Sequence, residues 1–391
     1  MLFRSQRTAT AVVVNLNTGS TSGGAGIDSL TGIEQVRGSA NNDQFIDSSR
    51  DETFTGGAGN DSFTITGGVD VITDLGQGVD QLQVIGGTVN ATVTANWTST
   101  SLSINQSVAN LLSNGVIVNL SAIAAGQGWT ISNTGGGTSL TGSQLNDTIN
   151  GGTQDDRLQG GIGDDSLTGG VGADTFVIDV GTDTVTDVGN GTDILQVRAG
   201  ATLNATIASS WAATSQSNNL GTATLTTPGL IVNLSAADIT AGNGWQIVNT
   251  GGNTGTTGTV MIGSGLGDTL TGSAGNDTLT GGGGVDQIEI TGGSDTVNDL
   301  GAGGADLLLV SAGATVVATI TAAWTPIAIT QASSSHSPVG RPNQVPPPPT
   351  PTATTKAATT AIATSAALPQ RITAVFDRRS ASAPANQEKR T

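Results

Sequence analysis

The sequence has no cysteine and no tyrosine, and its single histidine is His336. Without cysteine, the chain can form neither disulfides nor thiolate metal sites. One histidine near the C-terminal end excludes zinc sites of clustered histidines, and it excludes a Ser-His-Asp triad in the repetitive body of the chain. Aromatic residues make up only 3% of the chain, so a conventional globular core is not expected.

Long apolar runs are also missing. No stretch approaches the roughly 18 apolar residues of a membrane-spanning helix. The N-terminus carries Arg4 and Arg7, but the apolar run that follows, Ala11–Val14, is too short for a signal peptide. We therefore expect that any export of this chain uses another route.

Basic side chains are few over most of the chain. Residues 1–330 hold 28 acidic and 6 basic side chains, a balance of −22, whereas residues 331–391 hold 2 acidic and 7 basic, a balance of +5. An acidic body repels phosphates, which argues against a nucleic-acid partner, and it favours cations. The alternative is that the acidic residues only confer solubility. Their regular placement, described next, argues against that alternative.

Glycine is abundant, at 58 of 391 residues, and it follows a nine-residue period. Between Gly142 and Val177 four units follow one another without a gap: GSQLNDTIN, GGTQDDRLQ, GGIGDDSLT and GGVGADTFV. Each has Asp at its sixth position and an apolar residue at its eighth. This is the pattern G-G-x-G-x-D-x-U-x of calcium-binding parallel β-helix repeats.

Fourteen units share this frame, and all have an apolar eighth residue. Thirteen carry Asp at position six and one carries Glu52. The units begin at residues 23, 38, 47, 56, 65, 142, 151, 160, 169, 178, 263, 272, 281 and 290. An Asp-x-apolar step continues the pattern just past each block, at Asp80, Asp193 and Asp306. In the unit that begins at Asp47, the residues Asp47, Asp51 and Glu52 replace the glycines and the Asp, so we predict no ligands in that unit.

Between the blocks lie Thr-, Ser- and Asn-rich spacers with short alternating β-prone runs. Trp97, Trp211 and Trp324 are 114 and 113 residues apart, and Trp129 and Trp245 are 116 apart, which indicates a superrepeat of about 113 residues. We expect the spacer tryptophans to fill a strand layer or cap a coil. Carbohydrate stacking is the alternative role.

These features divide the chain into seven segments. We predict a partial N-terminal module with the first block (1–83), a β-rich spacer (84–141), the second block (142–196), a second spacer (197–262), the third block (263–310), a truncated spacer (311–330) and a tail (331–391). The tail is rich in Pro, Ala and Thr and has little to bury, so we expect it to be disordered.

The spacing explains why such units would bind a cation. Glycines allow turns with φ > 0 and close backbone approach, and in the short strand that follows, position eight points inward while seven and nine face out. Two units make one coil, so residues 18 apart stack. Asp43 then stacks on Asp61, Asp147 on Asp165 and Asp183, Asp156 on Asp174, Asp268 on Asp286, and Asp277 on Asp295.

A hard cation with six to eight oxygen ligands suits such carboxylate rows, and calcium tolerates this geometry better than magnesium does. The alternative is that each Asp only forms its own turn, which does not explain their stacking in register. We therefore predict Ca²⁺ as the cofactor. The predicted ligands are Asp28, Asp43, Asp61, Asp70, Asp147, Asp156, Asp165, Asp174, Asp183, Asp268, Asp277, Asp286 and Asp295, in turns that include Gly56, Gly57, Gly59, Gly160, Gly161, Gly163, Gly169, Gly170, Gly172, Gly281, Gly282 and Gly284.

The blocks Gly23–Asp80, Gly142–Asp193 and Gly263–Asp306 resemble the RTX, or hemolysin-type, calcium-binding repeats of bacterial exported proteins. The resemblance implies an all-β fold, a parallel β-roll that is unfolded without calcium. It also implies a secreted, extracellular protein that folds after type I secretion. The family's secretion signal lies at the extreme C-terminus, which is the part of this chain that departs from the pattern.

We therefore expect a calcium-folded extracellular structural or surface module without catalysis. Two alternatives stay open: a non-catalytic repeat fragment of a secreted RTX enzyme or toxin, and a glycan-binding adhesin that uses the spacer tryptophans. Glycoside hydrolysis by the paired carboxylates is not expected, because it needs two carboxyls in unlike environments. The expected partners are calcium ions, with no nucleic acid, no membrane span and an unspecified cell-surface or glycan partner.

Overall fold

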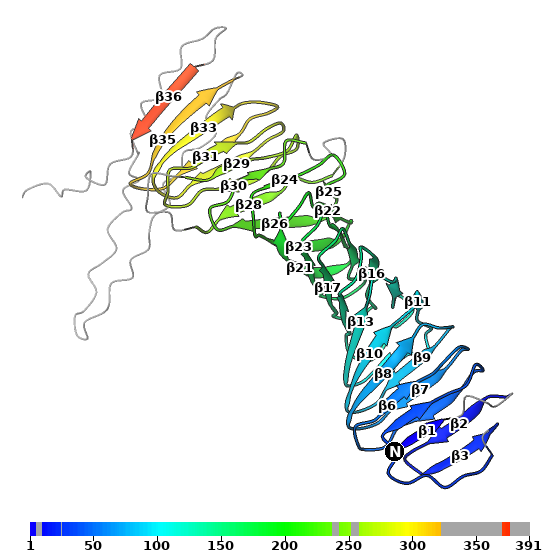
Figure 1. Cartoon of the computed structure of the whole chain (residues 1–391). Helices are drawn as coiled ribbons and strands as arrows, with labels where there is room; N and C mark the ends of the chain where they lie inside the picture. The colour runs from blue at the N-terminus through cyan, green and yellow to red at the C-terminus, as the bar shows by residue number, and fades with distance from the viewer. Residues whose placement is uncertain (5–9, 25, 237–241, 252–257, 322–369, 376–391) are drawn as a thin grey trace, which may run out of the picture.

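The structure is a computed structural model that describes residues 1–4, 10–24, 26–236, 242–251, 258–321 and 370–375. The described residues form strands and turns without a helix, and none of them could form a membrane-crossing helix. The chain winds into an elongated, curved solenoid in which successive strands stack along one axis (Figure 1). The predicted all-β parallel solenoid, a β-roll, is confirmed.

One face of the solenoid is a continuous sheet, here sheet A, with one strand from each coil. Its strands, in spatial order, are β1 (Leu2–Arg4), β4 (Gln35–Arg37), β6 (Thr53–Thr55), β8 (Val69–Leu75), β10 (Thr88–Val93), β13 (Val108–Ser113), β15 (Thr130–Asn133), β17 (Thr148–Gly152), β19 (Ser166–Gly170), β21 (Gly181–Val188), β23 (Ala201–Ile207), β26 (Thr222–Thr227), β28 (Gln246–Asn249), β30 (Thr269–Thr271), β32 (Gln287–Ile290) and β34 (Leu307–Val310).

The opposite face is divided into three sheets, and each division falls in a spacer. Sheet B contains β12 (Ile104–Asn105), β9 (Gln81–Val84), β7 (Ser62–Ile65), β5 (Gln44–Ile46), β2 (Val12–Asn15) and β3 (Ser20–Gly23). Sheet C contains β11 (Trp97–Thr98), β14 (Val118–Asn119), β16 (Ser139–Thr141), β18 (Arg157–Gln159), β20 (Thr175–Ile178), β22 (Ile194–Val197) and β25 (Asn218–Asn219). Sheet D contains β24 (Trp211–Ala212), β27 (Val232–Asn233), β29 (Val260–Ile262), β31 (Thr278–Thr280), β33 (Ser294–Leu300), β35 (Thr315–Ile320) and β36 (Gln370–Val375).

The register confirms that two nonapeptides make one coil. Ile149 on β17 pairs with Leu167 on β19, and Leu167 pairs with Val185 on β21, each 18 residues further along the chain. All three are eighth-position residues and are fully buried. The core is therefore a stack of eighth-position side chains, to which Phe45 and Phe63 contribute parallel rings with centroids 5.1 Å apart.

The spacers continue the solenoid instead of forming separate domains. The four described spacer tryptophans, Trp97, Trp129, Trp211 and Trp245, are all at most 2% exposed. The indole N–H of Trp97 donates to the backbone oxygen of Asp80, and that of Trp211 donates to the backbone oxygen of Asp193, both at 3.0 Å. These two tryptophans thus cap the last unit of blocks one and two. Trp324 lies outside the described residues.

Strand pairing is parallel except at the two ends. Near the N-terminal end β2 and β3 form an antiparallel hairpin, and at the other end β36 pairs antiparallel with β35. The strand β36 lies within residues 331–391, the segment predicted to be a disordered tail. It takes the edge of β35, where a further parallel coil would otherwise stack. The rest of the tail lies outside the described residues.

The eighth-position stack leads to a stability prediction. Leu167→Ala removes a fully buried side chain between Ile149 and Val185, so we expect it to lower the free energy of unfolding by about 2–5 kcal/mol. Urea denaturation with calcium present measures this loss. The matched control is Val171→Ala, four residues later at an exposed position, which should change stability by less than about 0.5 kcal/mol. Equal losses for the two variants would contradict this account of the core.

Candidate metal sites

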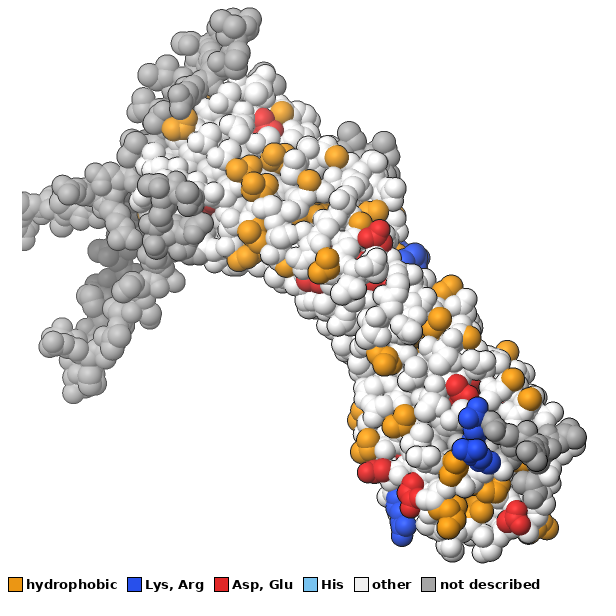
Figure 2. All heavy atoms as spheres, in the orientation of Figure 1, with side chains coloured by type: hydrophobic (Ala, Val, Ile, Leu, Met, Phe, Trp, Pro, Cys, Tyr) orange, Lys and Arg blue, Asp and Glu red, His pale blue; other side chains and the backbone are white. Residues whose placement is uncertain are grey.

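Nearly all the predicted ligand carboxylates are buried in the turns that precede the strands. The sixth-position Asp residues from Asp43 to Asp295 are 0–3% exposed. Consistent with this, Figure 2 shows few acidic side chains on the visible surface. Asp28 is the exception, because it is exposed beside the β2–β3 hairpin, where its backbone N–H donates to Thr21 Oγ1 at 2.9 Å. The structure does not bring Asp28 together with the others.

The buried carboxylates form columns along the solenoid, held by backbone hydrogen bonds. The N–H of Asp147 donates to Asp165 Oδ1 at 2.7 Å, and the N–H of Asp165 donates to Asp183 Oδ1 at 3.0 Å. The same bond joins all neighbours in a column. The columns are Asp43–Asp61–Asp80, Glu52–Asp70, Asp147–Asp165–Asp183, Asp156–Asp174–Asp193, Asp268–Asp286–Asp306 and Asp277–Asp295. The stacking in register that the sequence predicts is therefore present.

The first carboxylate of most columns receives its hydrogen bond from outside the nonapeptide blocks. The backbone N–H of Trp129 donates to Asp147 Oδ1, and that of Trp245 donates to Asp268 Oδ1, both at 2.5 Å. These two tryptophans recur in the superrepeat. The spacers thus fix where a column begins, because they supply the backbone donor that a preceding repeat would otherwise supply.

The second oxygen, Oδ2, separates the turns into two kinds. In seven Asp residues Oδ2 is buried and has no hydrogen-bond partner among the described residues: Asp61, Asp70, Asp156, Asp165, Asp183, Asp286 and Asp295. A buried carboxylate oxygen without a partner is strongly unfavourable unless a cation approaches it. The middle members of three columns, Asp61, Asp165 and Asp286, all belong to this set.

In the other kind of turn the protein satisfies Oδ2 by itself. Where Ser replaces Gly at position two, its backbone N–H and hydroxyl both contact Oδ2, as Ser143 does on Asp147 at 2.5 and 2.8 Å. Ser39, Ser264 and Ser273 do the same for Asp43, Asp268 and Asp277. In the last units, backbone N–H groups of Gly76, Gly189 and Gly301 donate to Oδ2 of Asp80, Asp193 and Asp306. Ser at position two is therefore a signal in the sequence for a turn in which Oδ2 is satisfied.

The glycine at position one leaves the space into which Oδ2 points. A Cβ added at Gly160 would lie 2.1 Å from Asp165 Oδ2, and one added at Gly142 would lie 2.6 Å from Asp147 Oδ2 and 2.2 Å from the carbonyl oxygen of Gly160. A carboxylate and a carbonyl of the next coil therefore converge beside this glycine. Four of the predicted glycines stand at position one of their units, and in each an added Cβ would lie within 2.3 Å of an Asp Oδ2. They are Gly56, Gly160, Gly169 and Gly281.

The glycines at positions two and four shape the turn. Gly161 has φ +107° and Gly163 has φ +128°, in the region that favours glycine, and a Cβ at Gly161 would lie 2.0 Å from the carbonyl oxygen of Ser143 in the preceding coil. The coils could not stack so closely with side chains there. The equivalent positive-φ positions are Gly57, Gly59, Gly170, Gly172, Gly282 and Gly284.

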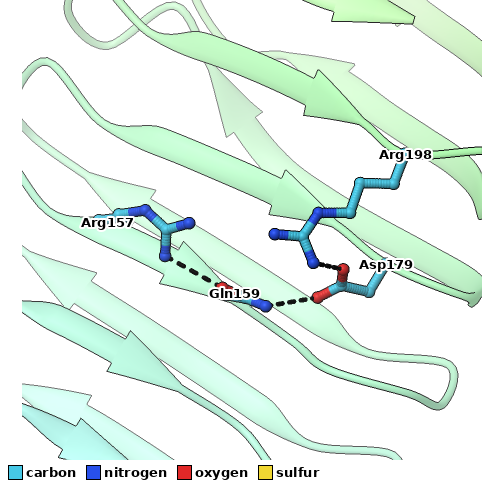
Figure 3. Close-up of polar contacts among 4 residues, drawn as sticks. All are labelled: Arg157, Gln159, Asp179 and Arg198. Atoms are coloured by element: carbon cyan, nitrogen blue, oxygen red, sulfur yellow. Dashed lines mark hydrogen bonds and ion pairs between the residues drawn. The ribbon is translucent and has the colours of Figure 1, made fainter. Parts of the chain in front are cut away.

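The charge of the columns is not neutralised by basic side chains. Neither of the two ion pairs between described residues involves a column carboxylate. One joins the N-terminal amine to Glu34, and the other joins Arg198 to Asp179 on the outside of sheet C. Figure 3 shows the second pair in a polar row with Gln159, which donates to Asp179 Oδ2 at 2.9 Å, and with Arg157, which donates to Gln159 Oε1 at 3.1 Å.

Burial makes several of the column carboxyl groups weak acids. Burial is the main cause that raises the pKa of Asp165 to about 7; the hydrogen bond from Asp147 N–H opposes the shift, and the charges of Asp183 and Asp147 add to it. The pKa values of Asp61, Asp174, Asp286 and Asp295 are raised to about 7 and that of Asp183 to about 6, with burial again the largest cause. Near neutral pH these groups therefore lose charge or need a counter-ion.

The donor set fits calcium. The groups that converge in each glycine turn are carboxylate and carbonyl oxygens, which are the ligands of hard cations. The described columns contain no nitrogen or sulfur ligand that a softer metal would select. A divalent ion held between the coils would supply the partner that the seven unpartnered Oδ2 atoms lack, and it would offset the repulsion along each column.

Sequence reasoning missed two sets of residues that support the turns. Asn or Asp at position five accepts a backbone hydrogen bond from the next coil, as Asn146 does from Asp164 N–H at 2.9 Å. Asp74, Asp187 and Asp299 each accept two N–H bonds from a Gly-Gly pair of the preceding coil, Asp187 from Gly169 at 3.0 Å and Gly170 at 2.7 Å. Asp74, Asp187 and Asp299 recur at the spacing of the superrepeat, and this recurrence could have identified them from the sequence.

The unpartnered oxygen of Asp165 leads to a substitution test. Asp165→Ala removes that oxygen and the acceptor for Asp147 N–H; the lost acceptor alone costs about 1–3 kcal/mol, so we expect half-maximal folding to need roughly tenfold more calcium. The control is Asp51→Ala, an exposed position-five residue whose Oδ1 accepts only the Val69 N–H, which should shift the midpoint less. Calcium titration by circular dichroism gives both midpoints, and equal shifts would argue against ion binding in the columns.

The raised pKa values lead to a pH prediction for the calcium-free chain. The folded state holds protons on groups such as Asp165 and Asp286 more tightly than the unfolded state does. These groups therefore favour folding below the ordinary Asp pKa of 3.8, and this contribution is lost as pH rises through about 7. With a chelator present, the β signal should increase as pH is lowered from about 8 to about 5. A β signal that does not change with pH would contradict the claim that the folded chain holds protons on these buried carboxylates.

The model of one protein family matches the chain. It describes the RTX calcium-binding nonapeptide repeat in four copies, and it matches residues 34–72, 141–176 and 262–297. These three ranges overlap the three blocks and carry most members of the columns described above; Asp80, Asp183, Asp193 and Asp306 lie outside them. The first match begins after the unit at residue 23, which the structure also leaves outside the columns. No curated protein matches this sequence.

Proposed function

Because the chain carries RTX calcium-binding nonapeptide repeats in three blocks, we propose that it is a calcium-folded structural module that acts outside the cell without catalysis of its own. The observation that carries the proposal is the set of seven buried Asp Oδ2 atoms without a partner, in a repeat family that binds calcium. Calcium ions between the coils would complete the turns and so form part of the fold itself.

The same arrangement supports the proposal of an extracellular site of action. Each column offers only two or three carboxylates, and extracellular calcium modules typically bind at about 10⁻⁴–10⁻³ M, far above cytosolic calcium. At cytosolic calcium the carboxylates within each column would repel one another, and the coils would not close. Outside the cell, calcium would drive folding. This supports secretion as an unfolded chain, consistent with type I export of related repeats.

The proposal of a structural role without catalysis is supported by the carboxylates and by the tryptophans. The carboxylates Asp61, Asp165 and Asp286 lie buried in turns, and burial raises the pKa of each to about 7, whereas acid–base catalysis needs two groups whose pKa values differ. The four described spacer tryptophans are buried, so none of them offers a ring face to a sugar. A repeat segment of a larger secreted enzyme or toxin is the second candidate, and it has the same calcium chemistry.

Far-UV circular dichroism of the full chain during a calcium titration tests the proposal. We expect a chain with little β signal in chelator at about pH 8, and a cooperative gain of β signal as calcium reaches the range of about 10⁻⁴–10⁻³ M. Magnesium at the same concentrations is the control, and it should give a much smaller gain because it holds its water ligands. Full β structure in chelator would remove calcium-dependent folding, and with it the proposed function.

A further inference from the structure

The one unit of the fourteen without Asp at its sixth position contributes to a cluster of three carboxylates. The unit that begins at Asp47 lacks both the first glycine and the sixth-position Asp, and has Asp47 and Glu52 in their places. The structure brings these two side chains beside Asp70, which lies 18 residues after Glu52 in the next coil. One carboxylate oxygen from each of the three lies within 4.8 Å of the other two. All three side chains are 0–2% exposed.

One oxygen of this cluster has no partner in the described part of the chain. Asp70 Oδ1 accepts the N–H of Glu52 at 2.8 Å, but Asp70 Oδ2 is buried and receives no hydrogen bond. Asp70 is completely buried. The charges of Asp47 and Glu52 act on this carboxyl group, which places it among like charges. A group of this kind needs a positive partner, and no ion pair between described residues supplies one.

The other two carboxylates are held in place by neighbouring turns. Asp47 accepts the backbone N–H groups of Thr66 at 2.7 Å and Gly67 at 3.0 Å, and its other oxygen accepts the Thr66 hydroxyl at 2.6 Å. The hydroxyl of Ser48 donates to Glu52. All three carboxylates are thus held in place by hydrogen-bond donors while one oxygen of each lies close to the other two.

The two substitutions compensate each other. In a consensus turn the first residue is glycine, and its missing side chain leaves room for the Asp Oδ2, as at Gly56, where an added Cβ would lie 2.3 Å from Asp61 Oδ2. At position 47 a side chain occupies this place and brings its own carboxylate. The residue at position six is then Glu, which is one methylene longer. The pair keeps the coil closed and replaces a turn of mixed carbonyl and carboxylate oxygens with one in which carboxylates predominate.

We propose that Asp47, Glu52 and Asp70 form a separate divalent-cation site that binds calcium more tightly than the glycine turns do. Calcium bonds of about 2.3–2.6 Å allow opposite ligands to lie up to about 5 Å apart, which accommodates the separation of these oxygens. Three carboxylates carry one more negative charge than a pair of stacked Asp residues, and ligand charge raises calcium affinity. The inference rests on the proposed calcium-dependent fold and adds to it a site that the repeat pattern does not contain.

Equilibrium dialysis of the full chain, with bound calcium measured by atomic emission, tests this site. We expect Glu52→Gln and Asp47→Asn each to bind one ion fewer per chain than the wild type at saturating calcium, with the β signal retained. In the wild type this ion should stay bound at free calcium about tenfold lower than the ions of the columns. The matched control is Asp51→Asn, an exposed acidic residue of the same unit, which should bind as many ions as the wild type.

The outcomes separate this inference from the proposed function. A wild type that folds with calcium, together with a Glu52→Gln variant that binds the same number of ions, overturns the inference alone; the cluster then holds a proton in place of a cation. A wild type that binds no calcium overturns both.

If Glu52→Gln fails to fold, the double variant Asp47→Gly/Glu52→Asp decides the matter, because it restores a glycine turn. The inference then requires that the double variant bind as many ions as the wild type at saturating calcium. None of these ions should stay bound at the roughly tenfold lower free calcium that the wild-type site tolerates. An unchanged titration would overturn it.

Discussion

The buried carboxylate at the sixth position of each repeat is the constraint on which the rest of the structure depends. At Asp165, for example, burial raises the pKa to about 7, and the charges of the stacked neighbours Asp183 and Asp147 add to the shift. The fold answers with one backbone N–H for each Oδ1 and, in the units that begin with glycine, with space beside that glycine for Oδ2. What the backbone cannot supply is a second positive partner, and Asp61, Asp165 and Asp286 show this need most clearly because each lies in the middle of a column.

The spacers limit how far the repulsion accumulates. No described column contains more than three carboxylates, because a spacer interrupts the stack before a fourth can join. The backbone of Trp129 opens a column at Asp147, and the indole of Trp211 closes another at Asp193. Ser143 completes the first turn without an ion. At the ends of each block the protein itself supplies hydrogen-bond donors to the carboxylate Oδ2 atoms, whereas in the middle most Oδ2 atoms are left for ions from the solvent. Sheet A continues through all three blocks.

The period of nine predicted most of the fold, because it encodes which side chains point inward. It placed Leu167 between Ile149 and Val185 and Asp165 on Asp147 correctly. It failed where residues outside the nine-residue unit determine whether a coil stacks or whether a carboxylate oxygen has a hydrogen-bond partner. Asp28 sits in a consensus unit, but the adjacent antiparallel hairpin prevents its coil from stacking. Ser143 and Gly161 both fit position two, but the hydrogen bonds show that one satisfies Oδ2 and the other leaves it unpartnered. The pairing of β36 depends on an edge that no local pattern describes.

A proton and a calcium ion both relieve a buried carboxylate, but they act on different scales. A proton satisfies one oxygen of one residue and leaves the neighbouring coil unchanged. A calcium ion takes six to eight oxygens, so it must draw ligands from two coils at once, and each coil of a column shares its carboxylate with the next. Closing one site therefore positions half of the adjacent site. The coupling is strongest in the three-member columns and ends at the spacers, so each block should fold as a cooperative unit.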